Sequence, residues 1–296
     1  MRVLSTWKAL ADYLPPAERA GLRASEALPF AVALTEAADL HPLYRPRSRF
    51  AYKGDFGHGL LAAGSTGKAG AAVLAAKAAL RSGLGLLTVW TTPDNRTVLQ
   101  TAVPEAMVEA GPLSPRPFAD YAAVGVGPAF GLGEAAGARL GDLLQRAATA
   151  ALPVVLDADA LTLIARQPAL AEGLLRLPGS ICTPHYGELR RLVGPWQSAE
   201  ERLRRQQAFS DRYRTVVVGK GAYTLITFPA ATEVGQADRT DRADRVAGSP
   251  TARLNPTGNA GMATGGSGDV LAGILLGLLT QGYTPDEAAL LGVYLH

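Results

Sequence analysis

A glycine-rich loop runs directly into an apolar helical stretch near the C-terminal end of the sequence. Residues 255–275 read NPTGNAGMATGGSGDVLAGIL. Glycines at such a place free backbone N–H groups to converge on an anion, and the start of the following helix adds partial positive charge. We therefore expect Gly266, Ser267 and Gly268 to form an anion hole for a phosphate group.

Asp269 would lie in the first turn of that helix, beside the anion hole. Its carboxylate could there take a proton from a hydroxyl group aligned with a bound phosphoryl group. The alternative is that Asp269 only caps the helix, as aspartates often do. The length of the glycine-rich context favours the catalytic interpretation.

Short apolar runs, turns and amphipathic segments alternate along the sequence, and these elements must position the glycine-rich loop. Strands separated by helices predict an α/β fold with a mostly parallel sheet and helices on both faces. We expect a helix over 70–82 and strands over 59–63, 86–91, 122–126, 154–157, 180–183 and 215–219. Ligands of such sheets bind beyond the carboxyl ends of the strands.

Three groups of polar residues follow these expected strands. Asp157 and Asp159 alternate along the chain, so one is expected to face the ligand cleft, with Asp157 favoured, while the other caps the next helix. Glu188 stands where it could reach Mg²⁺ through water, or where a helix dipole simply favours an acidic residue. Lys220 precedes Gly221 at a strand end, where its amine could bind a phosphate group or could only extend to solvent.

The glycine-rich loop also carries a family resemblance. Gly265-Gly266-Ser267-Gly268-Asp269 resembles the anion-hole motif of the ribokinase-like superfamily, and GNAGMATGGSGDVLAG resembles the NAD(P)H-hydrate dehydratases in particular. The family usually has Thr in place of Ser267. Similar segments lie at 53–57, 155–161, 183–188 and 220–224, so the resemblance covers roughly residues 50–296.

The resemblance implies a ribokinase-like three-layer fold over residues 46–296. Residues 1–45 are rich in Ala, Leu and charged residues and are interrupted by prolines, so they predict an N-terminal extension of one or two short helices. It implies that ATP or ADP, with Mg²⁺, drives the dehydration of hydrated NADH or NADPH. It also implies a homo-oligomer, with a tetramer as the candidate form. Asp269 would be the catalytic residue and also bind substrate with Ala71, Gly127 and His185, whereas Lys220, Gly221, Ala222, Tyr223, Thr224 and Gly268 would bind the nucleotide.

Rival functions stay open at this point. A plain kinase of the same superfamily would phosphorylate a vitamin precursor or sugar and release a stable phosphoester. A nucleotide-binding regulatory module would show no turnover. Ala129 stands where the family's Gly-Pro-Gly-X-Gly loop has its second glycine, so it needs negative φ or strain, and an inactivated relative is the third alternative.

Composition and charge indicate which classes of binding partner to expect. The 296 residues are 48% apolar and 19% charged, with a net charge of +3 and arginines scattered along the chain, which does not indicate nucleic acid binding. The longest apolar run, 270–279, is about half of the roughly 20 residues that cross a bilayer, so we expect a buried helix and no membrane partner. The lone Cys182 and the charged N-terminus indicate a reducing cytoplasm. Residues 234–254 are polar and predict an exposed loop or long hairpin.

Overall fold

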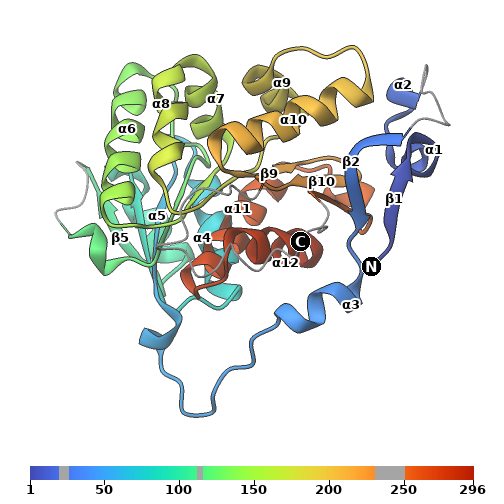
Figure 1. Ribbon diagram of the computed structural model, residues 1–296. Coiled ribbons are helices and arrows are strands. Elements are labelled where there is room, and N and C mark those ends of the chain that lie inside the picture. The colour runs from blue at the N-terminus through green and yellow to red at the C-terminus, as the bar shows by residue number, and fades with distance from the viewer. Residues whose placement is uncertain (20–26, 112–115, 231–250) are drawn as a thin grey trace.

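An eleven-stranded sheet forms the centre of the molecule in the computed structural model, which describes residues 1–19, 27–111, 116–230 and 251–296 (Figure 1). Its strands are β1 (Val3–Thr6), β2 (Ala27–Leu34), β3 (His58–Ala62), β4 (Leu86–Thr91), β5 (Met107–Ala110), β6 (Ala123–Val126), β7 (Val154–Leu156), β8 (Ser180–Cys182), β9 (Val216–Gly219), β10 (Thr224–Thr227) and β11 (Ala252–Asn255). Their order across the sheet is β1-β2-β11-β10-β9-β8-β7-β6-β3-β4-β5.

The run of strands from β9 to β5 is parallel throughout. β10 lies antiparallel to both β9 and β11, whereas β2 pairs with β11 in parallel and with β1 antiparallel. The prediction of a mostly parallel sheet is confirmed, and each strand expected from the sequence is found within one residue at each end. The carboxyl ends of β9, β8, β7, β6, β3 and β4 therefore share one edge, which we call the carboxyl edge.

Helices cover both faces of the sheet (Figure 1). They are α1 (Trp7–Leu10), α2 (Pro16–Arg19), α3 (Ala37–Leu40), α4 (Ala69–Arg81), α5 (Arg96–Ala102), α6 (Glu134–Thr149), α7 (Ala158–Arg166), α8 (Pro168–Gly173), α9 (Tyr186–Val193), α10 (Ala199–Tyr213), α11 (Ser267–Thr280) and α12 (Pro285–Leu295). One apolar core contains side chains of α4, α5, α11 and α12, and a second contains side chains of α6, α7, α8, α9 and α10.

The apolar run 270–279 lies inside α11, which packs against the Ala-rich helix α4. Small residues on α4 let the two helices approach closely, so that an added Cβ at Gly273 of α11 would collide with the backbone oxygen of Ala75. This confirms the prediction of a buried helix. Among the described residues, no helix is long and apolar enough to cross a membrane.

The N-terminal segment differs from its prediction as a purely helical extension. Besides the short helices α1 and α2 it contributes β1 and β2, and β2 joins the main sheet beside β11. The reason is the apolar run in β2, whose Val32 and Leu34 are buried in a third apolar core with side chains of α1, α10, β10 and β11. The boundary at residue 45 stays a prediction.

The predicted loop over 234–254 lies outside the described residues up to position 250. Its last residues belong to β11, which pairs antiparallel with β10 from Thr224↔Asn255 to Thr227↔Ala252. The antiparallel pair of β10 and β11 agrees with the hairpin alternative at this end of the predicted segment.

Candidate functional site

The glycine-rich loop meets the start of α11 at the carboxyl edge. Gly266 precedes the helix with φ +96°, a conformation that favours glycine, and an added Cβ there would collide with Leu74 of α4. Gly268 faces the strand ends, since its added Cβ would lie 3.2 Å from Lys220 Nζ. The Ser267 hydroxyl donates to the Thr264 carbonyl oxygen over 3.2 Å, so this side chain fixes the loop. The residues of the predicted anion hole are therefore adjacent at a helix N-terminus.

Asp269 lies in the first turn of α11, half-buried, as the sequence predicted. Burial raises the pKa of its carboxyl, and the negative charge of Asp157 raises it further. The positive charge of Lys220 opposes both effects. A carboxylate with a raised pKa beside an anion hole suits a general base.

Asp157 and Lys220 form a buried ion pair between the ends of β7 and β9. Lys220 Nζ donates to Asp157 Oδ1 over 2.7 Å, and the Thr183 hydroxyl donates to the same oxygen over 2.6 Å. The Asp157 side chain is 2% exposed and that of Lys220 is 21% exposed. Asp157 thus faces the site as favoured, and the amine of Lys220 is held at the wall of the anion hole rather than extending freely to solvent.

The prediction that the other aspartate caps the next helix was wrong. β7 ends at Leu156, so Asp157 stands at the N-cap of α7, but its side chain makes no capping bond. Asp159 accepts a hydrogen bond from the Gly131 backbone N–H over 2.8 Å. Its carboxylate therefore fixes the loop that follows β6 instead of the helix.

His185 and Glu188 cap the start of α9 reciprocally. His185 Nδ1 accepts from the backbone N–H groups of Gly187 and Glu188 at 3.0 and 3.4 Å, and Glu188 Oε2 accepts from the His185 backbone N–H at 2.9 Å. With Nδ1 as acceptor, the neutral ring carries its proton on Nε2. Glu188 is 6% exposed, so the helix-start alternative describes its contacts. Its predicted role toward Mg²⁺ stays a prediction.

The two loops that follow β3 and β6 lie side by side. The Gly64 backbone N–H donates to the Pro128 carbonyl oxygen over 2.9 Å. Gly127 has φ +133°, and an added Cβ would collide with the backbone of Asp157, so only glycine fits between the ends of β6 and β7. Ala71 is half-buried in the first turn of α4, just after the Gly64 loop.

Ala129, the departure noted in the sequence, has φ +49°. It adopts the left-handed conformation that the family's glycine would adopt freely, and an L-residue there costs roughly 1–2 kcal/mol. The loop after β6 therefore keeps a glycine-like shape at the expense of strain.

The turn 220–224 connects β9 to β10. An added Cβ at Gly258 would collide with the Ala222 carbonyl oxygen, so the loop after β11 packs onto this turn. The Tyr223 ring, 39% exposed, meets the edge of Tyr13 with ring centroids 5.2 Å apart. Sequence reasoning missed Tyr13, because no pattern in residues 1–45 connects it to a segment 210 positions away.

His296, which sequence reasoning also missed, contacts the predicted anion hole. Its Nε2 lies 2.9 Å from the Ser267 carbonyl oxygen, at the first residue of α11. Burial lowers the pKa of this imidazole, and the nearby charge of Lys220 lowers it too, whereas the bond to Ser267 raises it. A terminal histidine far from any motif gives no signal in the sequence.

The segment 53–57, one of those that resemble the family, does not lie near the other residues of the site. It forms a short 3₁₀ helix before β3, and an added Cβ at Gly57 would collide with the Thr280 carbonyl oxygen at the far end of α11. A helix of 14 residues separates the two ends by about 20 Å. Within one chain this segment lies at the opposite edge of the sheet.

Among the described residues, no group of three or more His, Cys, Asp or Glu side chains is arranged to hold a metal ion. Cys182 is buried in β8, where burial raises the pKa of its thiol to about 12. The carboxyl edge thus combines an anion hole, one half-buried carboxylate and one paired ammonium group. This set can bind a phosphorylated ligand and remove a proton from a hydroxyl group close to it.

Comparison with known proteins agrees with this chemistry. A family model described as NAD(P)H-hydrate dehydratase matches residues 59–296. A bifunctional NAD(P)H-hydrate repair enzyme of Coxiella burnetii is 37% identical over 270 residues, which are 89% of this chain and 49% of that protein. The chain spans about half the length of the first curated relatives that it matches.

Two crystal structures are similar in fold. A ribokinase-like superfamily protein of Enterococcus faecalis is 28% identical with a TM-score of 0.70, over 90% of this chain and 86% of that one. The ADP/ATP-dependent NAD(P)H-hydrate dehydratase of Bacillus subtilis, co-crystallised with ATP and Mg²⁺, is 30% identical with a TM-score of 0.70, over 90% and 87%. These likenesses confirm the predicted ribokinase-like fold.

Proposed function

Because the chain belongs to the NAD(P)H-hydrate dehydratase family, we propose that it restores hydrated NADH and NADPH to the intact dinucleotides at the expense of ATP or ADP. The observation that carries this proposal is the position of Asp269. Its half-buried carboxylate stands in the first turn of α11, beside Gly268 and within the electric field of Lys220. The same arrangement supports phosphoryl transfer to a hydroxyl group.

The reaction proceeds by phosphorylation and elimination. The hydroxyl oxygen of the hydrated ring attacks the terminal phosphorus of the nucleotide, Asp269 accepts the hydroxyl proton, and the bond to the bridging oxygen breaks to release ADP from ATP or AMP from ADP. Phosphate leaves far more easily than hydroxide. The lone pair of the ring nitrogen then expels it, and loss of a ring proton restores NAD(P)H.

The remaining predicted residues take positions around this centre. Gly266, Ser267 and Gly268 present backbone N–H groups to the transferring phosphoryl group. The dinucleotide contacts Ala71, Gly127 and His185, whose elements α4, β6 and α9 all open onto the carboxyl edge. The nucleotide lies along the turn 220–224 between β9 and β10, where Lys220, Gly221, Ala222, Tyr223 and Thr224 bind it beside Gly268.

The carboxylates at the carboxyl edge fit a magnesium ion that arrives with the nucleotide. Mg²⁺ keeps several waters and is bound mainly by phosphates with one or two carboxylates. Glu188 would hold one of those waters, since its buried carboxylate lies beside His185 at the carboxyl edge. When bound, the ion neutralises charge on the phosphates.

We also propose a cytoplasmic homo-oligomer, with the tetramer as the form to test. The single buried cysteine fits a reducing compartment. The small net charge of +3 gives no basis for nucleic acid binding.

The test is recovery of NAD(P)H absorbance when chemically hydrated cofactor is mixed with the protein, Mg²⁺ and either ATP or ADP. Recovery that requires nucleotide, with release of free phosphate, supports the dehydratase and identifies its donor. Asp269→Asn should lower turnover by roughly 10²-fold or more while nucleotide binding persists. Unchanged turnover would rule out the assigned base, and a stable phosphoester in place of free phosphate would identify a kinase.

A further inference from the structure

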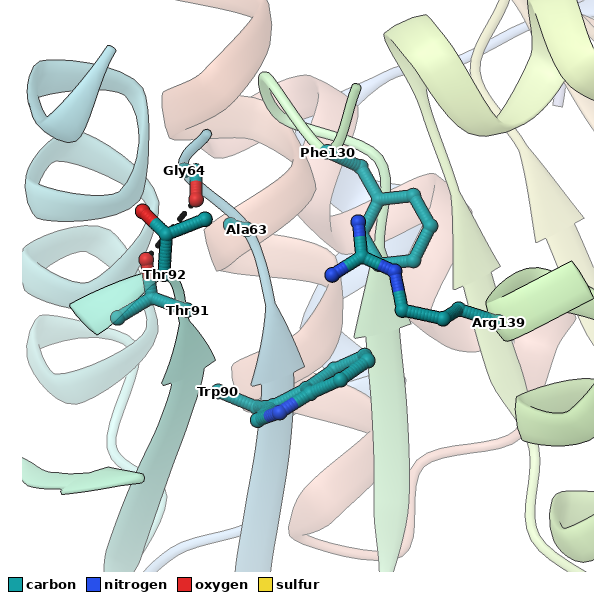
Figure 2. Close-up of a pocket in the computed structure, with 7 residues that line it drawn as sticks. All are labelled: Ala63, Gly64, Trp90, Thr91, Thr92, Phe130 and Arg139. Atoms are coloured by element: carbon teal, nitrogen blue, oxygen red, sulfur yellow. Dashed lines mark hydrogen bonds between the residues drawn. The ribbon is translucent and has the colours of Figure 1, made fainter. Parts of the chain in front are cut away.

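A small pocket opens at the carboxyl edge on the side away from the turn 220–224. It is lined by Ala63, Gly64, Trp90, Thr91, Thr92, Phe130 and Arg139 (Figure 2). These residues come from the ends of β3 and β4, from the loop after β6 and from α6. The loop after β6, whose Gly127 is proposed to contact the substrate, therefore contributes Phe130 to the pocket beside Gly64.

Arg139 holds its guanidinium group at this pocket between two aromatic rings. Its Cζ lies 5.1 Å from the centre of the Phe130 ring and 5.4 Å from that of Trp90. Figure 2 shows the guanidinium beside the Phe130 ring, with Gly64 and Thr92 across the pocket. Such contacts orient a cation without neutralising it, so its N–H donors stay available.

Two polar atoms of this pocket lack partners among the described residues, whereas the Thr91 hydroxyl and the Trp90 ring N–H donate to the backbone oxygens of Gly64 and Gly111. Arg139 Nε and Thr92 Oγ1 are both buried and make no hydrogen bond there. Within the same described ranges, Arg139 forms no ion pair with a carboxylate. Buried donors in native proteins are nearly always satisfied, so two orphaned groups at one pocket call for a polar atom between them, either a water molecule or an oxygen of a bound ligand.

The size and charge of the pocket define the ligand. Its volume of about 10 Å³ is close to that of one water molecule, which excludes an adenine or a ribose ring and admits a single oxygen atom. A guanidinium group stacked on rings favours a negatively charged oxygen, and phosphate oxygens match its fork geometry. Carboxylates match it as well, but hydrated NADH and NADPH carry phosphates and no carboxylate, so on this substrate the matching group is a phosphate that places one oxygen in the pocket.

The distance along the sheet connects this pocket to the proposed reaction. From β7, which carries Asp157 beside Asp269, the strand order runs β6, β3, β4 to Thr92. Three steps of about 4.8 Å give an offset of roughly 14 Å along the sheet. Trp90, Phe130 and α6 belong to the second core and α11 to the first, so a dinucleotide with its reacting ring at Asp269 would also cross the carboxyl edge to reach the pocket. The proposed binding site of the phosphoryl donor, the turn 220–224, lies on the other side of Asp269, after β9.

We infer that Arg139, with Thr92, binds a phosphate of the hydrated dinucleotide, at the part of the substrate remote from the reacting ring. This inference rests on the proposed function for the identity of the ligand. The phosphate belongs either to the diphosphate bridge, present in both dinucleotides, or to the ribose 2′-phosphate, present only in the NADPH form.

Binding of hydrated NADH and hydrated NADPH, measured by calorimetry without ATP or ADP, tests the inference independently of turnover. Arg139→Gln should weaken binding roughly ten-fold or more, and Thr92→Val roughly two- to ten-fold. Equal losses for both ligands identify the diphosphate, and a loss restricted to hydrated NADPH identifies the 2′-phosphate. Unchanged affinity for both ligands in Arg139→Gln overturns the inference.

Arg146→Gln is the matched control. Arg146 lies on the same helix α6, and its guanidinium stacks at 4.3 Å on the ring of Phe118, which does not line the pocket. Arg146→Gln removes a similar cation–π contact from the same helix but leaves the lining of the pocket intact. The variant should therefore bind both ligands within two-fold of the wild type. An equal loss in both variants would show a general effect on α6 and would also overturn the inference.

The outcomes separate the two proposals. Nucleotide-dependent recovery of NAD(P)H with unchanged affinity in Arg139→Gln overturns only the phosphate site. Absence of recovery, with affinity that still depends on Arg139, overturns the dehydratase and retains the phosphate site.

Discussion

Lys220 Nζ lies 2.7 Å from Asp157 Oδ1, although the two residues are 63 positions apart and Asp157 is 2% exposed. The pair joins the ends of β7 and β9 beneath the anion hole. Because β8 separates these strands, the pair stiffens the carboxyl edge across its middle strand. Its two charges also act on Asp269 in opposite directions, so it influences both stability and the pKa of the proposed base.

Lys220→Met should lower the free energy of unfolding by about 3–5 kcal/mol, because it leaves the carboxylate of Asp157 buried without its counter-charge. Urea unfolding measures the change. The double variant Asp157→Asn/Lys220→Met should recover part of the loss, since it removes the unpaired charge. Strictly additive losses would contradict the coupling between the two side chains.

The pH dependence of turnover should report the raised pKa of Asp269. A general base must be ionised, so kcat/KM should fall as the pH drops through a value above the ordinary aspartate pKa of about 3.9. Asp157→Asn should move this acid limb to lower pH, because it removes a like charge and leaves Lys220 positive. An acid limb that shifts upward in this variant would disprove the assignment of the limb to Asp269.

Asp269→Asn should make the protein more stable at neutral pH. The folded pKa is raised above the unfolded value, so folding favours the protonated carboxyl and the ionised form opposes folding. Removing the charge should raise Tm, by about 2–4 °C for each kcal/mol, and the gain should vanish below the unfolded pKa. Thermal unfolding at neutral and acidic pH checks this, and a lower Tm at neutral pH would count against the raised pKa.

Ala129→Gly should stabilise the protein by up to about 1 kcal/mol, since it relieves the left-handed conformation of Ala129. Ala138→Gly is the control, because Ala138 is exposed within α6, where glycine costs roughly 0.5–1 kcal/mol. The same substitution should thus have opposite signs at the two positions. Chemical unfolding of both variants decides, and destabilisation by Ala129→Gly would show that the loop does not hold this strain.

Much of the fold follows from local pattern. The apolar runs of β3, β4, β6, β7, β8 and β9 are bounded by glycine, proline or aspartate, so their positions are visible in the sequence. The glycine-rich loop and the position of Asp269 are equally local. A motif read along the chain therefore predicted the position of Asp269 at the start of α11, whereas its catalytic role stays a prediction.

The contacts that sequence reasoning missed connect distant segments. Arg139 appears in the sequence as one more arginine on an amphipathic helix, and only the approach of β4 and the loop after β6 gives it two aromatic neighbours. Tyr13 meets Tyr223 because β2 attaches the N-terminal segment beside β11. Conversely, Lys53 belongs to a recognisable segment that the topology carries to the opposite edge.

The pairing of β2 with β11 has a consequence for the order in which the chain acquires its structure during synthesis. Arg253 Nη1 donates to the Leu34 carbonyl oxygen across 219 positions, and the neighbouring strand contacts span similar separations. The antiparallel pair of β1 and β2, with α1 and α2 between them, can form as soon as it is made, but β11, the parallel partner of β2, is made much later. Until then β2 is an open strand edge that can pair with other chains. The newly made protein should therefore be most vulnerable to aggregation in the interval after β2 is made and before β11 pairs with it.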